Sequence, residues 1–225
     1  MSEPGSSRRG RVHDAEGARE AILNAAEEVF AEHGFDGARV DAIAAKAGYN
    51  KSLLFQYFGD KLGLYTEVIE RSDKEMAGLQ GRLLAHLLED ETIATDAGKF
   101  RTLLETIVTG LFDYLIEHPR LVRILSWEAA EGWQTFAKFT SQFDTEDADM
   151  FEALFDRAWR AGLLRSNFNS VIQLTMILQL CMSYIVYLPL YGMLYTAEDF
   201  SAAASLAQAR AHIADFVVAG MMTER

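Results

Sequence analysis

Apolar residues recur every three or four positions along most of this chain, which is the spacing of helices with one buried face. The clearest stretch is VDAIAAKAGYNKSLLFQYF, residues 40–58. Its first half predicts a short helix whose apolar side chains share one face: Val40, Ile43, Ala44 and Ala47. Gly48 should end that helix, because glycine enters a left-handed turn without a Cβ clash. Asn50 can then cap a second helix that begins at Lys51.

The second helix, residues 51–58, has two different faces at 100° per residue. One face should pack into the core and carries Leu54, Phe55 and Phe58. The opposite face should point to solvent and carries Ser52, Leu53 and Gln56, with Tyr57 on the flank between them. Two short helices joined by a tight turn form a helix-turn-helix, whose second helix fits the major groove of DNA.

The segment GFDGARVDAIAAKAGYNKSLLFQYFGDK, which begins at Gly34, resembles the DNA-binding segment of the TetR family of bacterial transcriptional regulators. The similarity spans roughly Arg19 to Leu64. It rests on the turn glycine, the small alanine of the first helix, Lys51, the Tyr57-Phe58 pair and Lys61. Two positions depart from the pattern. Leu53 stands where the family usually has threonine, and Arg39 stands where it usually has serine or threonine.

The helical pattern and the resemblance together predict an all-α protein of about nine helices. We expect a flexible arm rich in Gly, Ser and Arg over residues 1–13, which either enters a minor groove or is a solvated tail. A three-helix DNA-binding domain should cover 14–60, with a first helix from Asp14 to His33. A ligand-binding and dimerisation domain should cover 61–225. Its expected helices are 61 to about 89, a fifth that breaks at His118-Pro119, a sixth to about 136, 150–161 and two C-terminal helices.

Charge is unevenly distributed along the chain. The net charge is −12; residues 1–61 hold 8 basic and 10 acidic residues, net −2, so 62–225 carry the remaining −10. We therefore expect a locally basic face around the helix-turn-helix on an acidic protein. The single cysteine excludes an internal disulfide framework. The first residues have no apolar core typical of a secretion signal, so a cytoplasmic protein is expected.

The residue types of the helix-turn-helix suggest separate roles in binding a double-stranded operator. Lys51, Lys61 and Arg39 can neutralise phosphates, and Tyr57 can donate its hydroxyl to one. Ser52 and Gln56 can reach base edges, whereas Leu53 can only offer apolar contact, for example to a thymine methyl group. Solvated surface charges are the plain alternative for each cation. The complete expected DNA-binding set is Arg39, Asn50, Lys51, Ser52, Leu53, Gln56, Tyr57 and Lys61. One such helix covers few base pairs, which favours a dimer on a pseudo-palindrome.

No charged residue occurs from Ser166 to Ala197. The run is long enough to cross a bilayer, but Gln173, Gln179 and Pro189 interrupt it and no basic cluster flanks it. We favour a helix buried on most sides by core, ligand cavity and partner subunit, with no membrane contact.

The last helix, Asp199 to about Met221, is rich in alanine. The resemblance implies that it forms a four-helix bundle across a two-fold axis with the helix before it, which would make the protein a homodimer. Packing within one chain is the alternative. The expected interface residues are Ile172, Val186, Ala203, Ala207, Ala211 and Ala214.

The C-terminal part is rich in aromatic and methionine residues, which suits an apolar cavity with a few polar groups. Ordinary core packing is the alternative for each. The expected ligand-binding residues are Phe112, Trp127, Glu128, Trp133, Phe155, Trp159, Met176, Gln179 and Tyr184. The ligand should be small and hydrophobic or aromatic. If Glu128 or Glu131 faces the cavity, a cationic ligand is favoured, because a buried carboxylate needs a partner.

Two other functional classes are the alternatives to a ligand-responsive regulator. An enzyme is disfavoured, because the chain has no HExxH, CxxC, P-loop, GxGxxG or GxSxG motif and its histidines lack metal-ligand spacing, so no cofactor or metal is expected. A membrane-tethered DNA-binding protein would use the uncharged run 166–197. The resemblance implies repression that a ligand relieves, through a long fourth helix that links the two parts.

Overall fold

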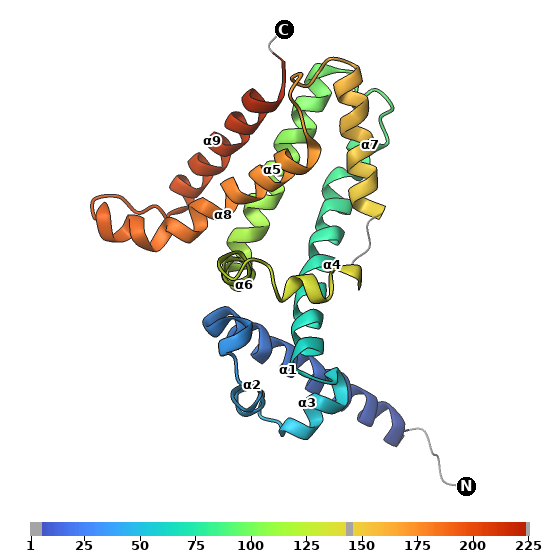
Figure 1. The fold of residues 1–225 in the computed structure, drawn as a ribbon, viewed down its shortest axis with the longest axis vertical. Helices are drawn as coiled ribbons and strands as arrows, with labels where there is room; N and C mark the ends of the chain where they lie inside the picture. Colours follow the sequence, from blue (N-terminus) through green and yellow to red (C-terminus); the bar gives the residue numbers. More distant parts are fainter. Residues whose placement is uncertain (1–5, 143–145, 224–225) are drawn as a thin grey trace. The chain divides into compact units, whose positions relative to one another are not determined.

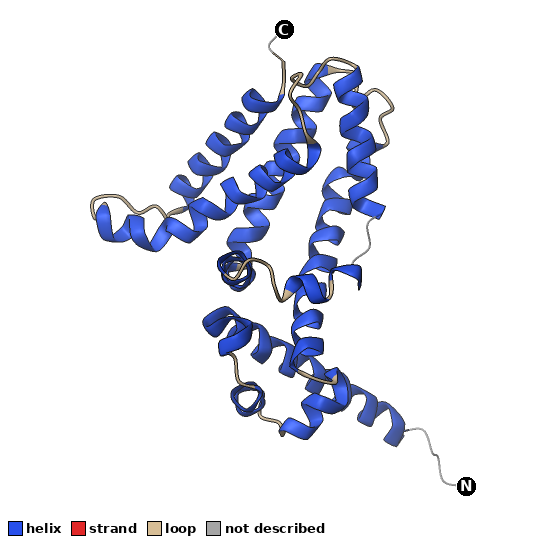
Figure 2. Ribbon diagram, in the orientation of Figure 1, coloured by secondary structure: helices blue, strands red, loops and turns tan. Residues whose placement is uncertain are grey.

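A computed structural model describes residues 6–142 and 146–223, and within these residues the chain is built from helices (Figures 1 and 2). The one β-type contact among them is an isolated antiparallel bridge between Leu164 and Met222. The all-α prediction is therefore confirmed. In chain order the elements are α1 (Ser6–Gly37), α2 (Val40–Ala47), α3 (Lys51–Phe58), α4 (Lys61–Leu88), α5 (Ala97–Glu117), α6 (Pro119–Ala130), the 3-10 turns η1 (Phe136–Lys138) and η2 (Thr140–Gln142), α7 (Glu146–Arg160), α8 (Ser170–Leu194) and α9 (Ala203–Met221).

The chain divides into two compact units. Of the described residues, the first unit contains 6–73 together with 123–142, and the second contains 74–122 and 146–223. Helices α4 and α6 each contribute residues to both. The compact units thus divide inside α4 and not after residue 60, because the first turns of α4 bury Leu64, Tyr65, Val68 and Ile69 in the core of the first unit.

The first unit is organised around α1, which supplies more of its buried apolar residues than any other helix, including Ile22, Val29 and Phe30. The helix begins at Ser6 and not at Asp14. Of the expected flexible arm, residues 1–5 lie outside the described residues, and 6–13 continue the helix. Once a helix has formed, each further residue that joins it adds one backbone hydrogen bond. The polar residues 6–13 can therefore continue a helix that the following residues have nucleated. Gly34 interrupts the helix with φ +67°, close to the expected stop.

In the second unit, α5 packs against both α8 and α9. Its start is capped by Asp96, whose Oδ1 accepts from the Lys99 amide at 2.9 Å. The predicted break at His118-Pro119 is confirmed, since α5 ends at Glu117 and α6 begins at Pro119. Helix α6 stops at Ala130, short of the expected residue 136, because Gly132 and Trp133 both have positive φ values, 71° and 61°.

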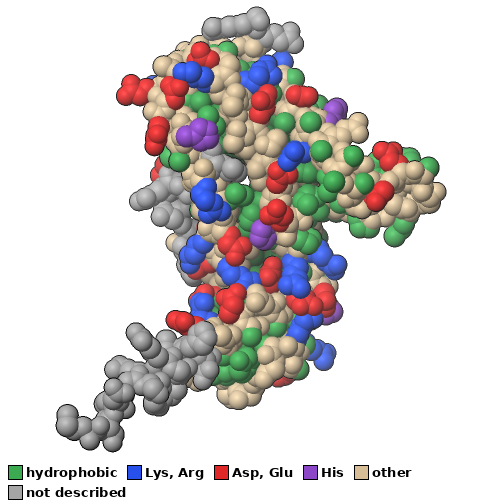
Figure 3. Space-filling view, turned by 180° about the vertical axis from the view of Figure 1, so that it is seen from behind, with side chains coloured by type: hydrophobic (Ala, Val, Ile, Leu, Met, Phe, Trp, Pro, Cys, Tyr) green, Lys and Arg blue, Asp and Glu red, His purple; other side chains and the backbone are tan. Residues whose placement is uncertain are grey.

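Helix α8 is the helix of the described chain that is long and apolar enough to cross a membrane. Only 17% of its apolar window is buried within the chain. The core of a single chain therefore does not cover this helix, and the expected burial by a ligand and a partner subunit stays a prediction. Figure 3 shows hydrophobic side chains spread over the C-terminal helices where they project from the second unit. The exposed large apolar residues of α8 are Val171, Ile172, Leu174, Met176, Val186, Tyr187, Leu190, Met193 and Leu194.

Candidate nucleic-acid interface

Two local features fix the turn between α2 and α3, a left-handed glycine and a side-chain cap, and the sequence predicted both. Gly48 lies in the left-handed region with φ 77°, and backbone N–H groups at this cap return to Ala44 and Ala45. Asn50 caps α3, because its Oδ1 accepts from the Leu53 amide at 2.9 Å. The helix-turn-helix is therefore fixed by backbone hydrogen bonds and by one side-chain cap.

Helix α3 presents a polar ridge. Lys51, Ser52 and Gln56 are exposed, whereas Leu54 and Phe58 are buried at 1% and 8% exposure. The predicted orientation of the helix is confirmed for these residues. Asn50 is exposed as well, but its side-chain oxygen is already occupied by the cap.

Two apolar side chains of α3 are placed differently from the prediction. Phe55 was expected in the core but is 41% exposed, and the Lys51 Nζ lies 5.8 Å from the centre of its ring. Leu53 was expected on the solvent face but is half-buried and packs against the core of the first unit. An eight-residue helix has only about two turns, so few of its side chains can reach the core. Leu54 and Phe58 are buried there, and the Phe55 ring remains exposed. Phe55 is therefore a candidate contact residue that periodicity alone missed.

The cations around the helix-turn-helix already have partners within the chain. Lys51 pairs with Asp41 at 3.1 Å, and Lys46 pairs with Glu28 at 2.5 Å. The Lys51 and Asp41 side chains are both substantially exposed, so water or phosphate can replace their pairing at small cost. Arg39 is exposed at the start of α2 and makes no capping hydrogen bond there.

Lys61 and Tyr57 lie at the C-terminal side of α3. The Lys61 Nζ donates to the Asp36 carbonyl oxygen at 3.3 Å and sits 4.6 Å from the centre of the Phe35 ring. Partial burial lowers the pKa of Lys61, while Asp36 opposes that shift. Tyr57 is half-buried, with its ring edge toward Phe58.

The structure does not bring the nine expected ligand-binding residues together. Trp127, Glu128 and Trp133 belong to the first unit. The remaining six belong to the second unit and occupy different environments: Phe112 and Phe155 are buried, Tyr184 is half-buried, and Trp159, Met176 and Gln179 are exposed. Two of the six lie together, since the ring centres of Phe112 and Tyr184 are 5.9 Å apart. The ligand-binding role of the nine residues stays a prediction.

Glu128 corrects the expectation of a cavity-facing carboxylate. The side chain is 1% exposed. Its Oε1 accepts from the Tyr65 hydroxyl at 2.7 Å and its Oε2 accepts from the Phe136 amide at 3.1 Å. Because these donors satisfy the buried charge, Glu128 does not require a cationic ligand.

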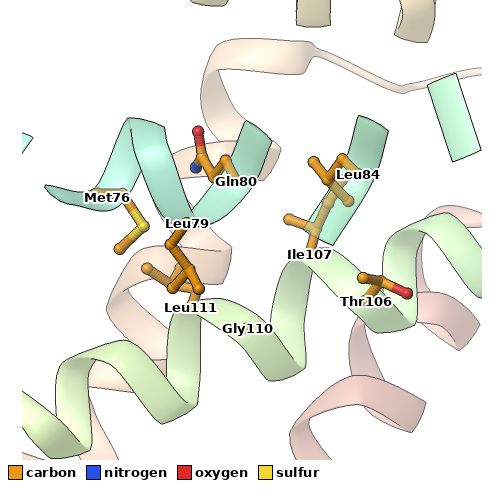
Figure 4. A pocket seen from close by; sticks show the side chains of 8 residues that line it. All are labelled: Met76, Leu79, Gln80, Leu84, Thr106, Ile107, Gly110 and Leu111. Carbon is orange, nitrogen blue, oxygen red and sulfur yellow. The ribbon is translucent and has the colours of Figure 1, made fainter. Parts of the chain in front are cut away.

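A small cavity of about 20 Å³ lies between α4 and α5 in the second unit. Figure 4 shows side chains of both helices around it, with Leu79 and Leu111 beside each other. None of the lining residues is charged, and none was in the expected ligand set. They are Met76, Leu79, Gln80, Leu84, Thr106, Ile107, Gly110 and Leu111.

The expected dimer residues divide into two groups. Ile172 and Val186 are 55% and 47% exposed, and Ala203, Ala207 and Ala211 are exposed on α9. Ala214 is 5% exposed, because that turn of α9 packs inside its own chain. It is therefore a core residue within the single chain.

Comparison with known sequences now adds to this geometry. The profile described as "Bacterial regulatory proteins, tetR family" matches residues 22–68. A second profile, "Tetracyclin repressor-like, C-terminal domain", matches residues 101–217, which are 117 of the 225 residues and so more than half of the chain. The chain belongs to the TetR family. Both the helix-turn-helix and the C-terminal helices are thereby assigned to known domains of that family.

Curated relatives of this TetR-family chain include two HTH-type transcriptional repressors. SCO4008 of Streptomyces coelicolor is 34% identical over 120 residues, which cover 53% of this chain and 54% of that protein. NicS of Pseudomonas putida is 30% identical over 118 residues, 52% of this chain and 51% of that protein. The chain thus matches about half the length of these relatives.

Solved structures share the fold over nearly the whole chain. The crystal structure of SCO4942 from Streptomyces coelicolor is 29% identical with a TM-score of 0.60, and the match covers 91% of this chain and 98% of that one. FadR from Bacillus subtilis, solved in complex with stearoyl-CoA, is 17% identical with a TM-score of 0.60, covering 89% and 98%. At 17% identity the second comparison concerns the fold alone.

Proposed function

We propose that this chain is a cytoplasmic transcriptional regulator that binds double-stranded operator DNA as a homodimer and releases it when a small hydrophobic ligand binds. The observation that carries the proposal is the exposed ridge of α3, which offers Ser52 and Gln56 to solvent beside Lys51. A capped helix with this ridge fits a major groove. Repression is the expected mode, and SCO4008 and NicS, both repressors by name, support it.

Each side chain of the interface has a separate proposed role. Lys51, Lys61 and Arg39 neutralise phosphates, and Tyr57 donates its hydroxyl to one, which fixes the position of α3 without selecting a sequence. Ser52 and Gln56 bind base edges; the amide of Gln56 offers the donor and acceptor pair that adenine requires.

Apolar contact is assigned to Phe55 as well as to Leu53. Phe55 is the more exposed of the two, so its ring is the better candidate to touch a thymine methyl group. Asn50 keeps its capping role and helps the interface by fixing the first turn of α3.

A homodimer is supported by the apolar surface of α8. An exposed helix of this composition must be covered in solution. Ser166 to Ala197 contain no lysine or arginine, and the residues that follow them, Glu198 and Asp199, are acidic, which disfavours an anionic bilayer as the covering surface. A second copy of α8 and α9, meeting through Ile172, Val186 and the exposed alanines of α9, is the proposed partner.

The ligand is proposed to be apolar and to bind in the second unit. The cavity between α4 and α5 is lined by apolar side chains with Gln80 and Thr106 as the hydrogen-bonding groups. Its volume of about 20 Å³ holds no more than a water molecule, so a ligand must widen it. The complex of FadR with stearoyl-CoA concerns another protein of this fold, and it is consistent with a ligand that carries an apolar chain.

Selection from random DNA duplexes tests the proposed function directly. The purified chain should enrich a sequence with two inverted half-sites about one helical turn or slightly more apart. Footprinting should then show one protected patch per half-site. Failure to enrich any sequence, at low salt and with a dimeric protein, would reject sequence-specific DNA binding.

A further inference from the structure

Residues 123–142 are far from the helix-turn-helix in sequence but belong to the same compact unit. Two donors fix the segment to the end of α1: the Arg123 Nε donates to the Ala31 carbonyl at 3.0 Å, and the Trp127 Nε1 donates to the same oxygen at 3.3 Å. The Trp127 ring also packs closely on Gly34, where a Cβ atom would lie 3.1 Å from it. The segment is therefore an integral part of the first unit.

The most unusual contact of this segment is the buried pair of Tyr65 and Glu128, which are 63 residues apart. Glu128 is 1% exposed, and its two hydrogen-bond donors, the Tyr65 hydroxyl and the Phe136 amide, are both neutral. Burial, reinforced by the hydrogen bond to Glu128, raises the pKa of Tyr65, so the phenol keeps its proton and stays a donor. Removing one donor leaves a buried carboxylate with too few hydrogen bonds. The free-energy cost of that burial favours local unfolding that exposes the carboxylate to water.

The two partners lie on helices that matter for the interface. Tyr65 is one turn beyond Lys61 on α4, the helix that directly follows α3. Glu128 lies on α6, whose first residues, 119–122, belong to the second unit. The hydrogen bond therefore joins α6 to α4 within the first unit.

We propose that Glu128 is a positioning residue for the DNA-binding unit, whose hydrogen bond from Tyr65 fixes residues 123–142 to α4 beside the helix-turn-helix. The consequence for DNA binding rests on the function proposed above. Operator binding should stabilise α1 and α4 and, through the Tyr65–Glu128 pair, residues 123–142. None of residues 123–142 is among the proposed DNA contacts.

The decisive variant is the double substitution Tyr65→Phe with Glu128→Gln. Tyr65→Phe alone leaves the Glu128 charge with only the Phe136 amide and should lower thermal stability. Adding Glu128→Gln removes the charge and keeps an oxygen that accepts from Phe136, so thermal stability should recover. The hydrogen bond between α4 and α6 remains absent. Glu131→Gln is the matched control, because it removes a nearby carboxylate that accepts no hydrogen bond from Tyr65.

Hydrogen exchange on the full chain gives the readout, with the DNA duplex enriched by the unaltered protein as probe. We expect the duplex to slow amide exchange of residues 124–139 about tenfold in the unaltered chain and in Glu131→Gln. In the double variant this protection should vanish, although its thermal midpoint matches the control. A double variant that keeps the protection overturns the proposal, and so does a loss that follows only from a lowered thermal midpoint.

The same variants separate this proposal from the proposed function. If no duplex is enriched, DNA binding fails, but the pair can still be tested without DNA. Residues 124–139 should then exchange about tenfold faster in the double variant than in Glu131→Gln. Equal rates would show that the Tyr65–Glu128 hydrogen bond does not hold the segment.

Discussion

The two units differ in how much of their apolar surface is buried within the single chain. The first unit gathers most of its large apolar side chains in one buried core, and each carboxylate oxygen of its buried Glu128 accepts a hydrogen bond. The second unit leaves most of α8 uncovered, with residues such as Ile172 and Val186 exposed at 55% and 47%. The core of the first unit is therefore well covered within a single chain, whereas most of α8 in the second unit is not. The dimerisation and ligand binding proposed above are assigned to the second unit, and the proposed DNA binding to the first.

The largest expected effect comes from introducing negative charges into the exposed apolar surface of α8. Replacing Ile172 and Val186 by aspartate should convert the proposed dimer to a monomer, because each charge would have to be buried at the proposed interface. A single α3 would then engage one half-site, and operator affinity should fall about a thousandfold. Sedimentation and operator titration give the two readouts. Ala153→Asp, on the exposed side of α7, is the control that should stay dimeric. A dimeric double variant would place the interface elsewhere.

Removing the proposed phosphate-binding lysines should have the next largest effect on DNA binding. Both lysines lie in the first unit, so the second unit should be unaffected. Lys51→Ala with Lys61→Ala should weaken binding about a hundredfold for all sequences and reduce the dependence on log salt by about two counterions per protomer. Titrations at several salt concentrations measure both. Sedimentation should show an unchanged dimer. An unaltered salt slope would mean that these lysines remain with Asp41 and Asp36 and do not contact phosphates.

Substitutions on the ridge of α3 should change preference more than affinity. Gln56→Ala should cost about 1–3 kcal/mol of discrimination at one base pair and leave other positions unaffected. Phe55→Ala should act at a different base pair, by loss of apolar contact. Repeating the duplex selection with each variant shows which position relaxes. Uniform weakening without a change of preferred sequence would assign both side chains to the backbone of the DNA.

The smallest expected effects concern two glycines of α1. Gly34 has φ +67° and faces Trp127, so Gly34→Ala should lower the free energy of unfolding by about 1–3 kcal/mol. Gly17 is exposed, and a Cβ there meets nothing within 4 Å, so Gly17→Ala should raise it by up to about 1 kcal/mol. Chemical denaturation of both variants tests the pair. Equal effects would contradict both the backbone strain and the close contact with Trp127 assigned to Gly34.

Much of the interface could be predicted from the sequence, because its physics is local. The bounds of α2 and α3, the left-handed Gly48 and the Asn50 cap all depend on residues within a few positions of each other. Periodicity also placed Ser52 and Gln56 outside and Leu54 inside. It failed at Phe55, since a two-turn helix has room for few core residues and the rest of the core decides which aromatic enters.

The sequence by itself determined an all-α chain with a capped helix-turn-helix, because helix periodicity, glycine conformation and side-chain capping act between near neighbours. Only the tertiary structure decided that Glu128 pairs with Tyr65, that Ala214 lies inside its own chain and that α8 is left uncovered. These outcomes depend on which surfaces meet across long separations in sequence, 63 residues for the Tyr65–Glu128 pair. A pattern of apolar residues states that a face must be covered, but it does not identify the surface that covers it.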